Sequence, residues 1–555
     1  MAEAPIRRRR ILLLLLEFVT WERGRPLSYS AQFAIEDALV ALGAEVVTVP
    51  AFNEIRCTDR GSWLSRLDRL CGDEAFDMVW LWMSHSHLDE QLLTWLSKRA
   101  PIRVGFLIES LRYTDRELAQ NGTLRRYRTQ VMSRLPHLTH LLAVDEVDVD
   151  ELDGLDGVPV FWWPGTAPRR ALIVEPRKPV DSRAVFSGVS YWERTTLLAD
   201  PRLQRLLALA QGVEERLGLA AVYDRLMLGM YVYLADGGRA DRLDLQRWVG
   251  AWRTLRRAVF DAYASSLQHW SAVVALPSFV KTYASRLGEA MAAGRPIVVA
   301  EIADRPRNRA LFEDGEDMLL LDPARPDDLR DRLEQLAASP DLAARLTWRA
   351  RARLEAFHTT DVRVRQVMEW IEHGLPPDYG ERSFTDDQLV RLAAAAREGR
   401  PVDTPSTVDD VMAAISALPL PSMMPDAVRP ILTPELAVVL EGGSAVSINN
   451  WAACLETLAR LGDRDVFCWG AGARGRALVR AVAAAGFNVA GFLDSDVEKA
   501  GRSTGDVIIH GPDLLAGRSG GESRPFVFVA SVGALQIVRA LDSYGFHAPL
   551  DVLVV

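Results

Sequence analysis

AVVALPSFVKTYASRLGEAMAAGRPIVVA (residues 272–300) has the pattern of a strand, a loop, a helix and a second strand. The apolar run before Pro277 is typical of a buried strand in a parallel sheet. A helix is predicted over residues 286–293, and Gly294 ends it as a C-cap glycine does. The polar loop therefore delivers Lys281 and several hydroxyl groups to a helix N-terminus. Free backbone N–H groups and the helix dipole favour a phosphate or diphosphate at such a position.

The run Arg286-x-x-Glu289-Ala-Met-Ala-Ala-Gly294-Arg-Pro-Ile-Val-Val resembles the donor-site signature of GT-B glycosyltransferases. Its Arg-x-x-Glu spacing is similar to the branch named after spore-maturation proteins. The resemblance implies that Glu289 holds the ribose hydroxyls of a nucleotide-sugar and that the helix start, with Thr282 and Ser285, faces the diphosphate. Many retaining members carry another glutamate where this chain has Lys281. The sugar contacts and the stereochemistry are therefore left open.

Length and composition predict a globular chain of about three domains. The chain has 555 residues, of which 49% are hydrophobic and 25% are charged, as in ordinary soluble proteins. The net charge of −9 argues against a general nucleic-acid binder. Lysine is rare, so the retention of Lys281 beside the predicted phosphate site favours a need for a compact ammonium group; chance is the alternative.

Cysteine usage and the N-terminal run indicate a cytoplasmic protein. The four cysteines form no CxxC pair, so we expect buried thiols, no disulfide framework and no metal site. Residues 7–16 resemble the start of a signal peptide, but Glu17 interrupts an apolar run that is far shorter than the roughly 20 residues of a membrane helix. We expect a buried first strand and no transmembrane segment. Peripheral membrane contact through basic patches is left open.

Residues 1–165 are predicted to form the first, acceptor-side domain of a GT-B enzyme. One strand over residues 9–19, a helix over residues 31–42 and a strand over residues 45–50 begin an alternating α/β unit. The loop after the first strand contains Gly24. The resemblance implies that this loop contacts phosphate or acceptor, and a solvated loop is the alternative.

Three side chains in this part are candidate catalytic bases. His85 and His87 follow the carboxyl end of a predicted strand, where open α/β sheets bind ligands. A histidine there suits a base or an acceptor contact, whereas a metal site needs a third ligand that the sequence does not place. Glu109 follows the next strand, where the resembling family often has a carboxylate. Asp148 and Asp150 form a DxD pattern within an acidic run, which favours a solvated face.

Residues 166–375 are predicted to form the donor domain after a hinge at residues 165–179. The segment around Gly188 and Arg194 resembles the start of a GT-B C-terminal domain: the glycine allows close backbone approach, and the arginine reaches phosphate or caps a helix. Residues 201–265 look like a helical insertion without an assigned role. Residues 311–359 resemble the closing segment of GT-B enzymes. Residues 376–445 are rich in proline and are predicted to be a helical linker.

Residues 446–555 carry a Rossmann fingerprint. A predicted strand, a GxGxxG turn, a helix and a second strand that ends in an acidic residue follow in the expected order. The unit resembles small domains attached to sugar acetyltransferases and sugar methyltransferases. A bound nucleotide or NAD is one interpretation, and a module that binds no ligand tightly is the other. The residues predicted to contact such a cofactor are Gly470, Gly472, Arg474, Gly475, Asp494 and Asp496.

The predicted fold class is α/β, with two Rossmann-like GT-B domains facing a cleft and a third small Rossmann-like domain. The resemblance implies transfer of a sugar from a nucleoside diphosphate sugar to a hydroxyl of a glycan, a lipid-linked glycan or a protein. Lys281, Arg286 and the helix start would stabilise the diphosphate in place of a metal. His85, His87 or Glu109 would act as base if the reaction inverts. The rival hypotheses are a non-catalytic scaffold that senses nucleotide-sugars and an NAD-linked sugar-modifying enzyme.

Overall fold

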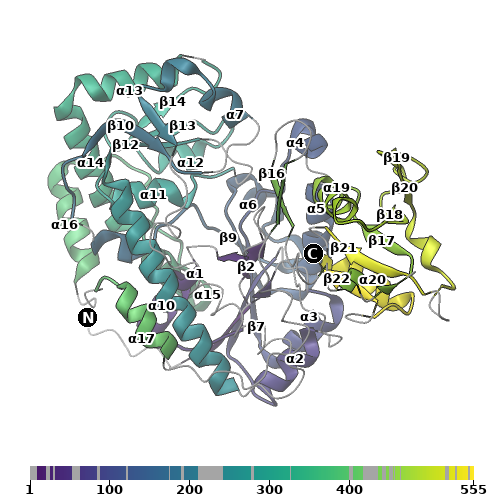
Figure 1. Ribbon diagram of the computed structural model, residues 1–555. Coiled ribbons are helices and arrows are strands. Elements are labelled where there is room, and N and C mark those ends of the chain that lie inside the picture. The colour runs from purple at the N-terminus through teal and green to yellow at the C-terminus, as the bar shows by residue number, and fades with distance from the viewer. Residues whose placement is uncertain are drawn as a thin grey trace.

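The computed structural model of this chain contains three large α/β sheets, which follow one another along the sequence (Figure 1). The residues that the structure describes are 9–14, 16–20, 26–28, 32–49, 51–52, 63–83, 88–120, 123–173, 175–188, 193–209, 242–276, 281–325, 327–398, 404–416, 436–439, 445–448, 454, 457–459, 461–462, 464–518, 524–531, 534–547 and 551–554.

The first sheet has six parallel strands in the order β4-β1-β6-β7-β8-β9. All residues of its strand β6 are buried, as expected where helices cover both faces of a parallel sheet. The strands are β1 (Arg10–Leu14), β4 (Glu45–Thr48), β6 (Met78–Trp82), β7 (Ile102–Leu107), β8 (His140–Ala143) and β9 (Val160–Trp162). The helices are α1 (Gln32–Ala41), α2 (Trp63–Cys71), α3 (Glu90–Arg99), α4 (Asp115–Gln120), α5 (Thr123–Arg134) and α6 (Glu146–Leu152), with a short 3-10 helix at Leu135–His137.

The prediction of a single strand over residues 9–19 is wrong. Strand β1 ends at Leu14, and β2 (Leu16–Thr20) pairs instead with β3 (Pro26–Ser28) and β5 (Ala51–Phe52) in a separate small sheet. The predicted span covers both β1 and most of β2, and hydrophobicity alone does not specify where the chain changes partner. Strand β3 also occupies part of the loop that was expected to follow the first strand.

The second sheet has five parallel strands in the order β11-β10-β12-β13-β14. Its strands agree closely with those predicted from residues 272–300. The strands are β10 (Asp181–Phe186), β11 (Leu207–Leu209), β12 (Trp270–Ala275), β13 (Ile297–Ala300) and β14 (Leu319–Leu321). The helices are α7 (Glu193–Leu198), α10 (Arg242–Leu267), α11 (Ser285–Ala292), α12 (Pro306–Ala310), α13 (Asp328–Ala338) and α14 (Pro340–Arg353).

Helix α15 (Thr360–His373) returns from the second sheet to the first. Its residues Val364, Val367 and Met368 share a buried cluster with side chains of the first sheet and of α1. After this helix, the hydroxyl of Tyr379 donates to the main-chain oxygen of Trp162 at 2.5 Å. The two halves are therefore tied together by the chain segment that follows the second sheet.

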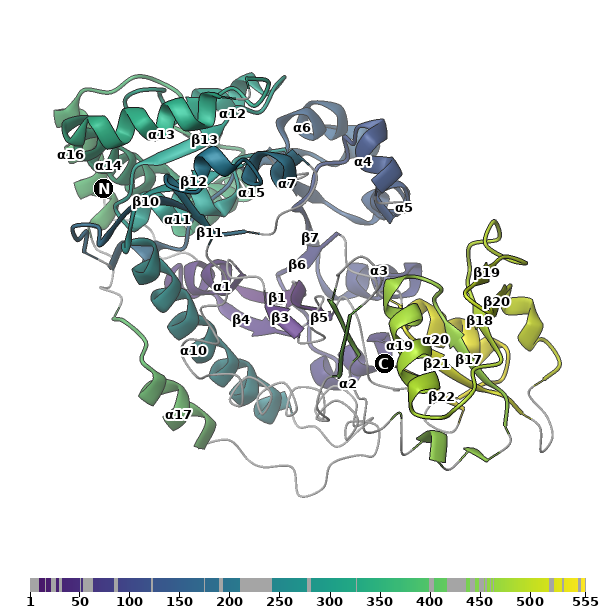
Figure 2. The same cartoon turned by 45° about the horizontal axis from the view of Figure 1, so that its top comes forward.

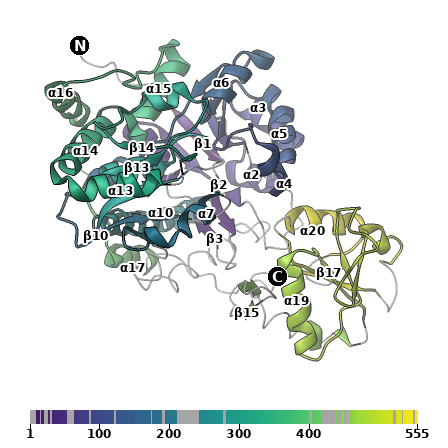
Figure 3. The same ribbon diagram turned by 90° about the horizontal axis from the view of Figure 1, so that it is seen from above.

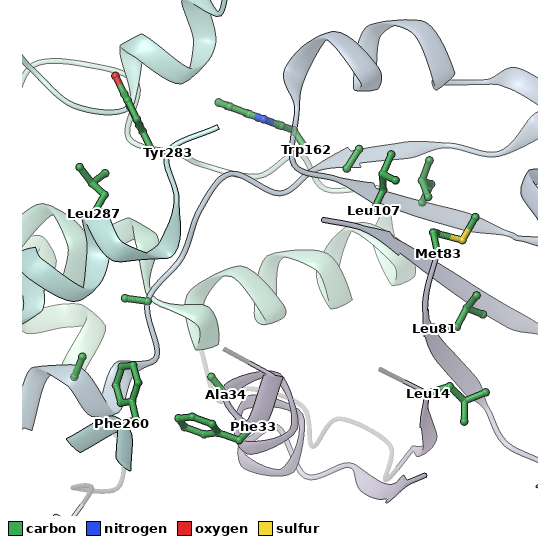
Figure 4. Close-up of a cluster of buried hydrophobic side chains, with 14 of the residues drawn as sticks. Leu14, Phe33, Ala34, Leu81, Met83, Leu107, Trp162, Phe260, Tyr283 and Leu287 are labelled. Atoms are coloured by element: carbon green, nitrogen blue, oxygen red, sulfur yellow. The ribbon is translucent and has the colours of Figure 1, made fainter. Parts of the chain in front are cut away.

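A shared hydrophobic core also joins the two sheets. Figure 4 shows side chains from the first half, including Leu14, Leu81 and Leu107, in the same cluster as Phe260 and Leu287 from the second half. The long helix α10 lies beside α1 and β4 (Figure 2). The segment for which the sequence predicted no role thus contains a helix that packs on both halves.

The third sheet has the strand order β19-β20-β18-β17-β21-β22 and stands to one side of the other two in Figures 1 and 3. It is parallel apart from its edge strand β19. Its elements are β17 (Val466–Trp469), α19 (Ala473–Ala484), β18 (Gly491–Leu493), β19 (Ser503–Thr504), β20 (Val507–His510), β21 (Phe526–Val529), α20 (Ala534–Ser543) and β22 (Val552–Val554). Before it come α16 (Asp386–Arg397), α17 (Val408–Ser416) and the hairpin β15 (Leu436–Val439) and β16 (Ala445–Ile448).

The topology confirms the predicted α/β class with two successive Rossmann-like sheets. Cys71, Cys454 and Cys468 are buried, as expected, while Cys57 lies outside the described residues.

Candidate functional site

The second sheet changes winding direction between β10 and β12, because the chain passes from β10 to β11 on one side and then to β12 on the other. Ligands of open α/β sheets bind outside the carboxyl ends of the strands at such a switch point. Ser187 and Gly188 follow β10, and the loop that leads to α11 follows β12. Helix α11 begins at Ser285 without a side-chain cap from Ala284, so its first N–H groups are not satisfied by that residue.

Glu289 is a buried carboxyl at this switch point. It lies on α11 with only 5% of its surface exposed, and the hydroxyl of Tyr263 on α10 donates to it. Burial raises the pKa of Glu289, while the nearby charge of Arg286 and the Tyr263 hydrogen bond act in the opposite direction. Tyr263 also hydrogen-bonds with Ser187 and Arg286. These contacts bring together side chains from α10, α11 and the end of β10.

Arg286 lies where Gly188 leaves room for it. A Cβ atom at position 188 would come within 2.9 Å of an Arg286 guanidinium nitrogen. The guanidinium groups of Arg286 and Arg194 both lie over the ring of Phe186, at 5.8 and 5.6 Å from its centre. Arg194 donates to the main-chain oxygen of Leu276 at 2.9 Å, whereas the buried Nε of Arg286 has no hydrogen-bond partner among the described residues. The site therefore concentrates positive charge beside the start of α11.

Lys281 joins this loop to the first half of the molecule. Its φ angle of 57° lies in the left-handed region, and its Nζ contacts an Oε1 of Glu117 on α4 at 2.6 Å. Glu117 is held in turn by the main-chain N–H and hydroxyl of Thr114, at 2.7 and 3.1 Å. The lysine predicted to meet a diphosphate thus meets a carboxylate of the opposite half. Thr282, next in the chain, donates its hydroxyl to Asn308 on α12 at 2.9 Å.

A second set of contacts between the halves comes from the acidic run, and here the expectation of a solvated face is wrong. Asp145, Glu146 and Asp148 are all buried, although Asp150 is exposed. Asp145 accepts two hydrogen bonds from Arg305 of the second half, at 2.5 and 2.9 Å. Composition alone suggested solvation, but Asp145 and Glu146 are buried where they meet Arg305 and the start of α12.

Helix capping explains why these acids point inward. The carboxylate of Glu146 accepts the main-chain N–H groups of Arg307 and Asn308 at the start of α12, at 3.1 and 2.6 Å. Asp145 caps α6 through the N–H of Val147. The sequence signal for the cap of α6 is an acid directly before the helix, at Asp145. No local pattern indicates that the neighbouring Glu146 caps a helix of the other half.

Glu109 lies beyond the carboxyl end of β7, on the side of the first sheet that meets the second half. Burial raises its pKa to about 7. Burial also raises the pKa of Asp148 to about 7, although that carboxylate accepts the N–H of Leu111 at 2.8 Å. Among the candidate bases, Glu109 is the one that the structure places. His85, His87 and the predicted donor contact Gly24 lie outside the described residues.

The glycine-rich turn of the third sheet is built differently. Asp494 accepts the N–H of Ala471 within the turn at 3.0 Å and the Nζ of Lys499 at 3.2 Å. A Cβ atom at Gly475 would lie 1.8 Å from the oxygen of Gly470, so this glycine permits close packing of helix and strand. The carboxylate predicted to contact a cofactor is bonded to its own turn.

The other residues predicted to contact a cofactor at this turn are partly or fully exposed. Gly472 has no atom within 4 Å of an added Cβ, Arg474 is half-buried, and Asp496 is exposed. The N–H of Asp496 donates to Asp494 at 3.0 Å. Across the described part of the chain, no three His, Cys, Asp or Glu side chains are arranged to hold a metal ion. The described helices include none with the length and apolarity needed to cross a membrane.

Residues 238–369 match a protein-family model described as glycosyl transferase-like. This match confirms the predicted glycosyltransferase family for the segment that contains the switch-point site. No curated protein matches the chain. Among solved structures, the chain is similar to a sucrose-phosphate synthase from Thermosynechococcus elongatus, with a TM-score of 0.41 and 14% identity over 66% of this chain and 100% of that chain. It is also similar to HepE from Anabaena in complex with UDP-glucose, with a TM-score of 0.38 and 12% identity over the same shares.

Proposed function

We propose that this chain, which contains a glycosyltransferase domain, transfers a sugar from a nucleoside diphosphate sugar to an acceptor hydroxyl. The observation that carries the proposal is the buried Glu289 with Tyr263 and Arg286 at the switch point of the second sheet. All three residues lie within the segment that matches the glycosyl transferase-like family.

Glu289 is suited to bind the ribose of the donor. A carboxylate accepts hydrogen bonds from two adjacent hydroxyls, and such bonds favour its charged form. Burial raises the pKa of Glu289, so the protein alone holds this charge at a cost that ribose hydroxyls would reduce. Tyr263 and Arg286 hold the carboxyl in place from two different helices. We expect Glu289 to contribute mainly to donor affinity.

The diphosphate is expected to lie beside the start of α11, with Ser285 and Arg286 next to it. Negative charge develops on this group as the bond from the sugar to phosphate breaks, and preorganised cations and N–H groups stabilise that charge. The Nε of Arg286, which has no hydrogen-bond partner in the described part of the chain, supports this role. Arg194 and Lys281 supply further positive charge from the neighbouring loops. In this proposal, these side chains replace a divalent metal.

Glu109 is the base in this proposal. The acceptor oxygen attacks the anomeric carbon, the bond from that carbon to the phosphate oxygen breaks, and the acceptor proton passes to the Glu109 carboxylate. The electron pair of the broken bond leaves with the nucleoside diphosphate. A pKa of about 7 suits a group that must be charged before reaction and accept a proton during it. Direct displacement of this kind inverts the anomeric centre.

The domain limits that accompany this proposal are residues 1–165 for the acceptor side and 166–375 for the donor side. Residues 376–445 are the linker, and residues 446–555 are the third unit. Helix α15 lies within the donor-side limits but packs on the first sheet.

The proposal is tested with the Glu289→Gln variant of the full chain. Nucleoside diphosphates of uridine, guanosine, thymidine and cytidine, and their sugars, are titrated by calorimetry and thermal shift. The variant should bind its nucleotide about 100-fold more weakly, because charge-assisted hydrogen bonds contribute about 1.5–3 kcal/mol each. Asp494→Asn is the matched control, since that carboxylate bonds its own turn, and its donor affinity should be unchanged.

Turnover separates transfer from sensing. Release of nucleoside diphosphate in the presence of glycan acceptors should fall at least as strongly in Glu289→Gln as binding does. Equal nucleotide affinity in Glu289→Gln and the unaltered chain would mean that Glu289 does not bind the donor, and would overturn the proposed site. Donor binding without cleavage of the sugar–phosphate bond for any acceptor would mean that the chain senses nucleotide-sugars and would overturn transfer.

A further inference from the structure

Asn308 is a buried amide on α12 that holds residues 281–284, here called the donor loop, in front of α11. The residue is 2% exposed, and its Oδ1 accepts the hydroxyl of Thr282 at 2.9 Å and the main-chain N–H of Tyr283 at 3.3 Å. Thr282, which the sequence predicted to face the diphosphate, thus donates its hydroxyl inside the protein. The donor loop is therefore bonded to the helix that follows the next strand of the sheet, β13.

The main chain of Asn308 is bonded to the first half of the molecule. Its N–H donates to one oxygen of Glu146 at 2.6 Å, and the N–H of Arg307 donates to the other oxygen at 3.1 Å. Glu146 is 3% exposed and belongs to α6, which follows strand β8 of the first sheet. Asn308 therefore links the two regions directly, with its N–H on the first half and its side chain on the donor loop.

Two residues beside these contacts have strained backbone conformations. Lys281 and Asp304 have φ angles of 57° and 59°, in the left-handed region that residues other than glycine adopt at a cost. Lys281 contacts Glu117 of the first half, and Arg305, the residue after Asp304, bonds to Asp145. Strained conformations persist where surrounding contacts impose them, and they concentrate at functional sites. Contacts from the first half thus help to hold the donor loop and the loop before α12 in these conformations.

Tyr283 connects the contact with Asn308 to the start of α11. Its main-chain oxygen packs so closely on Gly165 that a Cβ atom there would lie 1.9 Å away. Its side chain is 4% exposed and shares the hydrophobic core with Leu287 of α11 (Figure 4). Because Tyr283 is held at its N–H, its oxygen and its ring, and lies two residues before Ser285, its position determines where the first N–H groups of α11 point.

We propose that Asn308 is a positioning residue for the donor, and that through it Glu146 of the first half controls how well the second half binds a diphosphate. This inference rests on the proposed function. A diphosphate is bound best by N–H groups that are aligned before it arrives. If the donor loop is in this arrangement for a smaller fraction of the time, the apparent affinity for the nucleotide falls in proportion. In this proposal, Asn308 and Glu146 act without touching the nucleotide.

The arrangement makes donor binding depend on the contact between α6 and α12. Loss of the bonds from Glu146 would release Asn308, and with it the acceptor that the Thr282 hydroxyl and the Tyr283 N–H share. Coupling of this kind is reciprocal. A bound nucleoside diphosphate should therefore strengthen the contact between α6 and α12, and so hold the acceptor-side half in place during transfer.

The test uses Glu146→Gln, Asn308→Leu and the double variant of the full chain. Glutamine keeps the shape of Glu146 but offers one oxygen to two N–H groups, and leucine keeps the branching of Asn308 but accepts no hydrogen bond. Uridine, guanosine, thymidine and cytidine diphosphates are titrated by calorimetry, and hydrogen exchange is followed in peptides covering residues 281–287. Asp150→Asn is the matched control, because it removes the same charge from α6 but meets the side chain of Arg307, at 3.8 Å.

Each single variant should bind the tightest nucleoside diphosphate about 5- to 10-fold more weakly and should exchange faster in the donor loop, although Glu146 is bonded to α12 rather than to that loop. The double variant should lose less than the product of the two effects, because either change releases the same loop. Asp150→Asn should keep the unaltered affinity. Tyr379→Phe, which breaks another bond between the halves, should lower the thermal midpoint and leave nucleotide affinity unchanged.

Unchanged affinity in Glu146→Gln, or an equal loss in Tyr379→Phe, would overturn the inference, since the contact would then serve stability alone. Effects that multiply in the double variant would show that the two residues act independently, and would also overturn it. If Asn308→Leu does not fold, Glu146→Gln decides the matter. In these cases, weaker binding in Glu289→Gln would leave the proposed function intact, whereas equal nucleotide affinity in Glu289→Gln would remove the donor site and this inference with it.

Discussion

The edge where the first two sheets meet and the glycine-rich turn of the third sheet share a strand–loop–helix plan but treat their polar groups differently. At the first, the described residues offer no hydrogen-bond partner to the Nε of Arg286 or to the hydroxyls of Tyr113 and Tyr127, and burial raises the pKa of Glu289. In the turn, Asp494 is bonded to Ala471 and to Lys499. A helix N-terminus at a switch point is therefore not sufficient evidence of a ligand site. Groups without internal partners distinguish the first region from the second.

The largest expected effect concerns the base at the first region. Glu109→Gln should lower the rate of transfer about 100-fold or more, because general-base catalysis contributes roughly 10²- to 10⁴-fold. In the unaltered chain, kcat/KM should rise about tenfold per pH unit below 7 and level off above it, since a Glu109 with a pKa of about 7 is protonated at low pH. The measurement is a pH–rate profile with saturating donor.

Asp148→Asn is the control, because burial raises the pKa of Asp148 to about 7 as well. The amide oxygen still accepts the N–H of Leu111, so the loop should keep its position. If the pH-dependent limb persists in Asp148→Asn and vanishes in Glu109→Gln, the limb belongs to Glu109. The reverse result would mean that Asp148, and not Glu109, is the base. The titratable groups on which the charge of Glu109 acts are the phenols of Tyr113 and Tyr127.

Protein stability gives an independent check on the raised pKa of Glu109. Stability should fall with rising pH, whereas activity should rise. A carboxyl whose folded pKa is raised binds its proton more tightly in the folded chain than in the unfolded chain. The free energy of unfolding should therefore fall as pH rises from about 4.5 through 7. This decline should be smaller in Glu109→Gln, as measured by urea unfolding at several pH values. An equal decline in both proteins would contradict the burial of this charge.

An intermediate effect is expected in the third sheet, where glycines serve packing. Gly475→Ala places a Cβ 1.8 Å from a main-chain oxygen that no side-chain movement can clear, so the unit should lose about 3 kcal/mol of stability. Gly472→Ala, in open space, should cost under about 1 kcal/mol. Hydrogen exchange of β17 and β21 in the full chain reports this difference. Donor affinity should be unchanged in both variants, and a loss of affinity would mean that the third unit supports the donor site.

The sequence predicted those features that depend on local order. Strand β12, helix α11 and strand β13 follow the hydrophobic pattern of residues 272–300 within about two residues, and Arg286 and Glu289 are three apart on one helix face, which brings them together. Tyr263 was missed because its position depends on how α10 packs against α11. Its sequence context, a tyrosine in a long amphipathic helix, is ordinary.

The contacts between the halves were the least predictable from the sequence. An acidic run beside β8 indicates solvation by composition, yet Asp145 and Glu146 are buried because helix α12 and Arg305 of the other half meet them. Their partners lie about 160 positions away, which no local periodicity can indicate. Asn308 was missed as a positioning residue for the same reason, because its partners lie on α6 and in the loop before α11.

The smallest expected effect compares two lysine–carboxylate pairs. Lys281–Glu117 joins the two halves at 2.6 Å, and Lys499–Asp494 joins residues five apart at 3.2 Å. Double-mutant cycles with Lys→Met and the matching amides should give coupling energies of about 1 kcal/mol for the first pair and less for the second, whose lysine is more exposed.

Saturating nucleoside diphosphate distinguishes the two pairs further. If Lys281 supplies charge to the diphosphate, its Nζ shares that anion with Glu117, and the coupling energy of the first pair should shrink when the nucleotide is bound. The Lys499–Asp494 coupling should not change, because its carboxylate serves the glycine turn in either state. Unchanged coupling in both pairs would make Lys281 a purely structural link between the halves, and the positive charge at the diphosphate would then rest on Arg194 and Arg286.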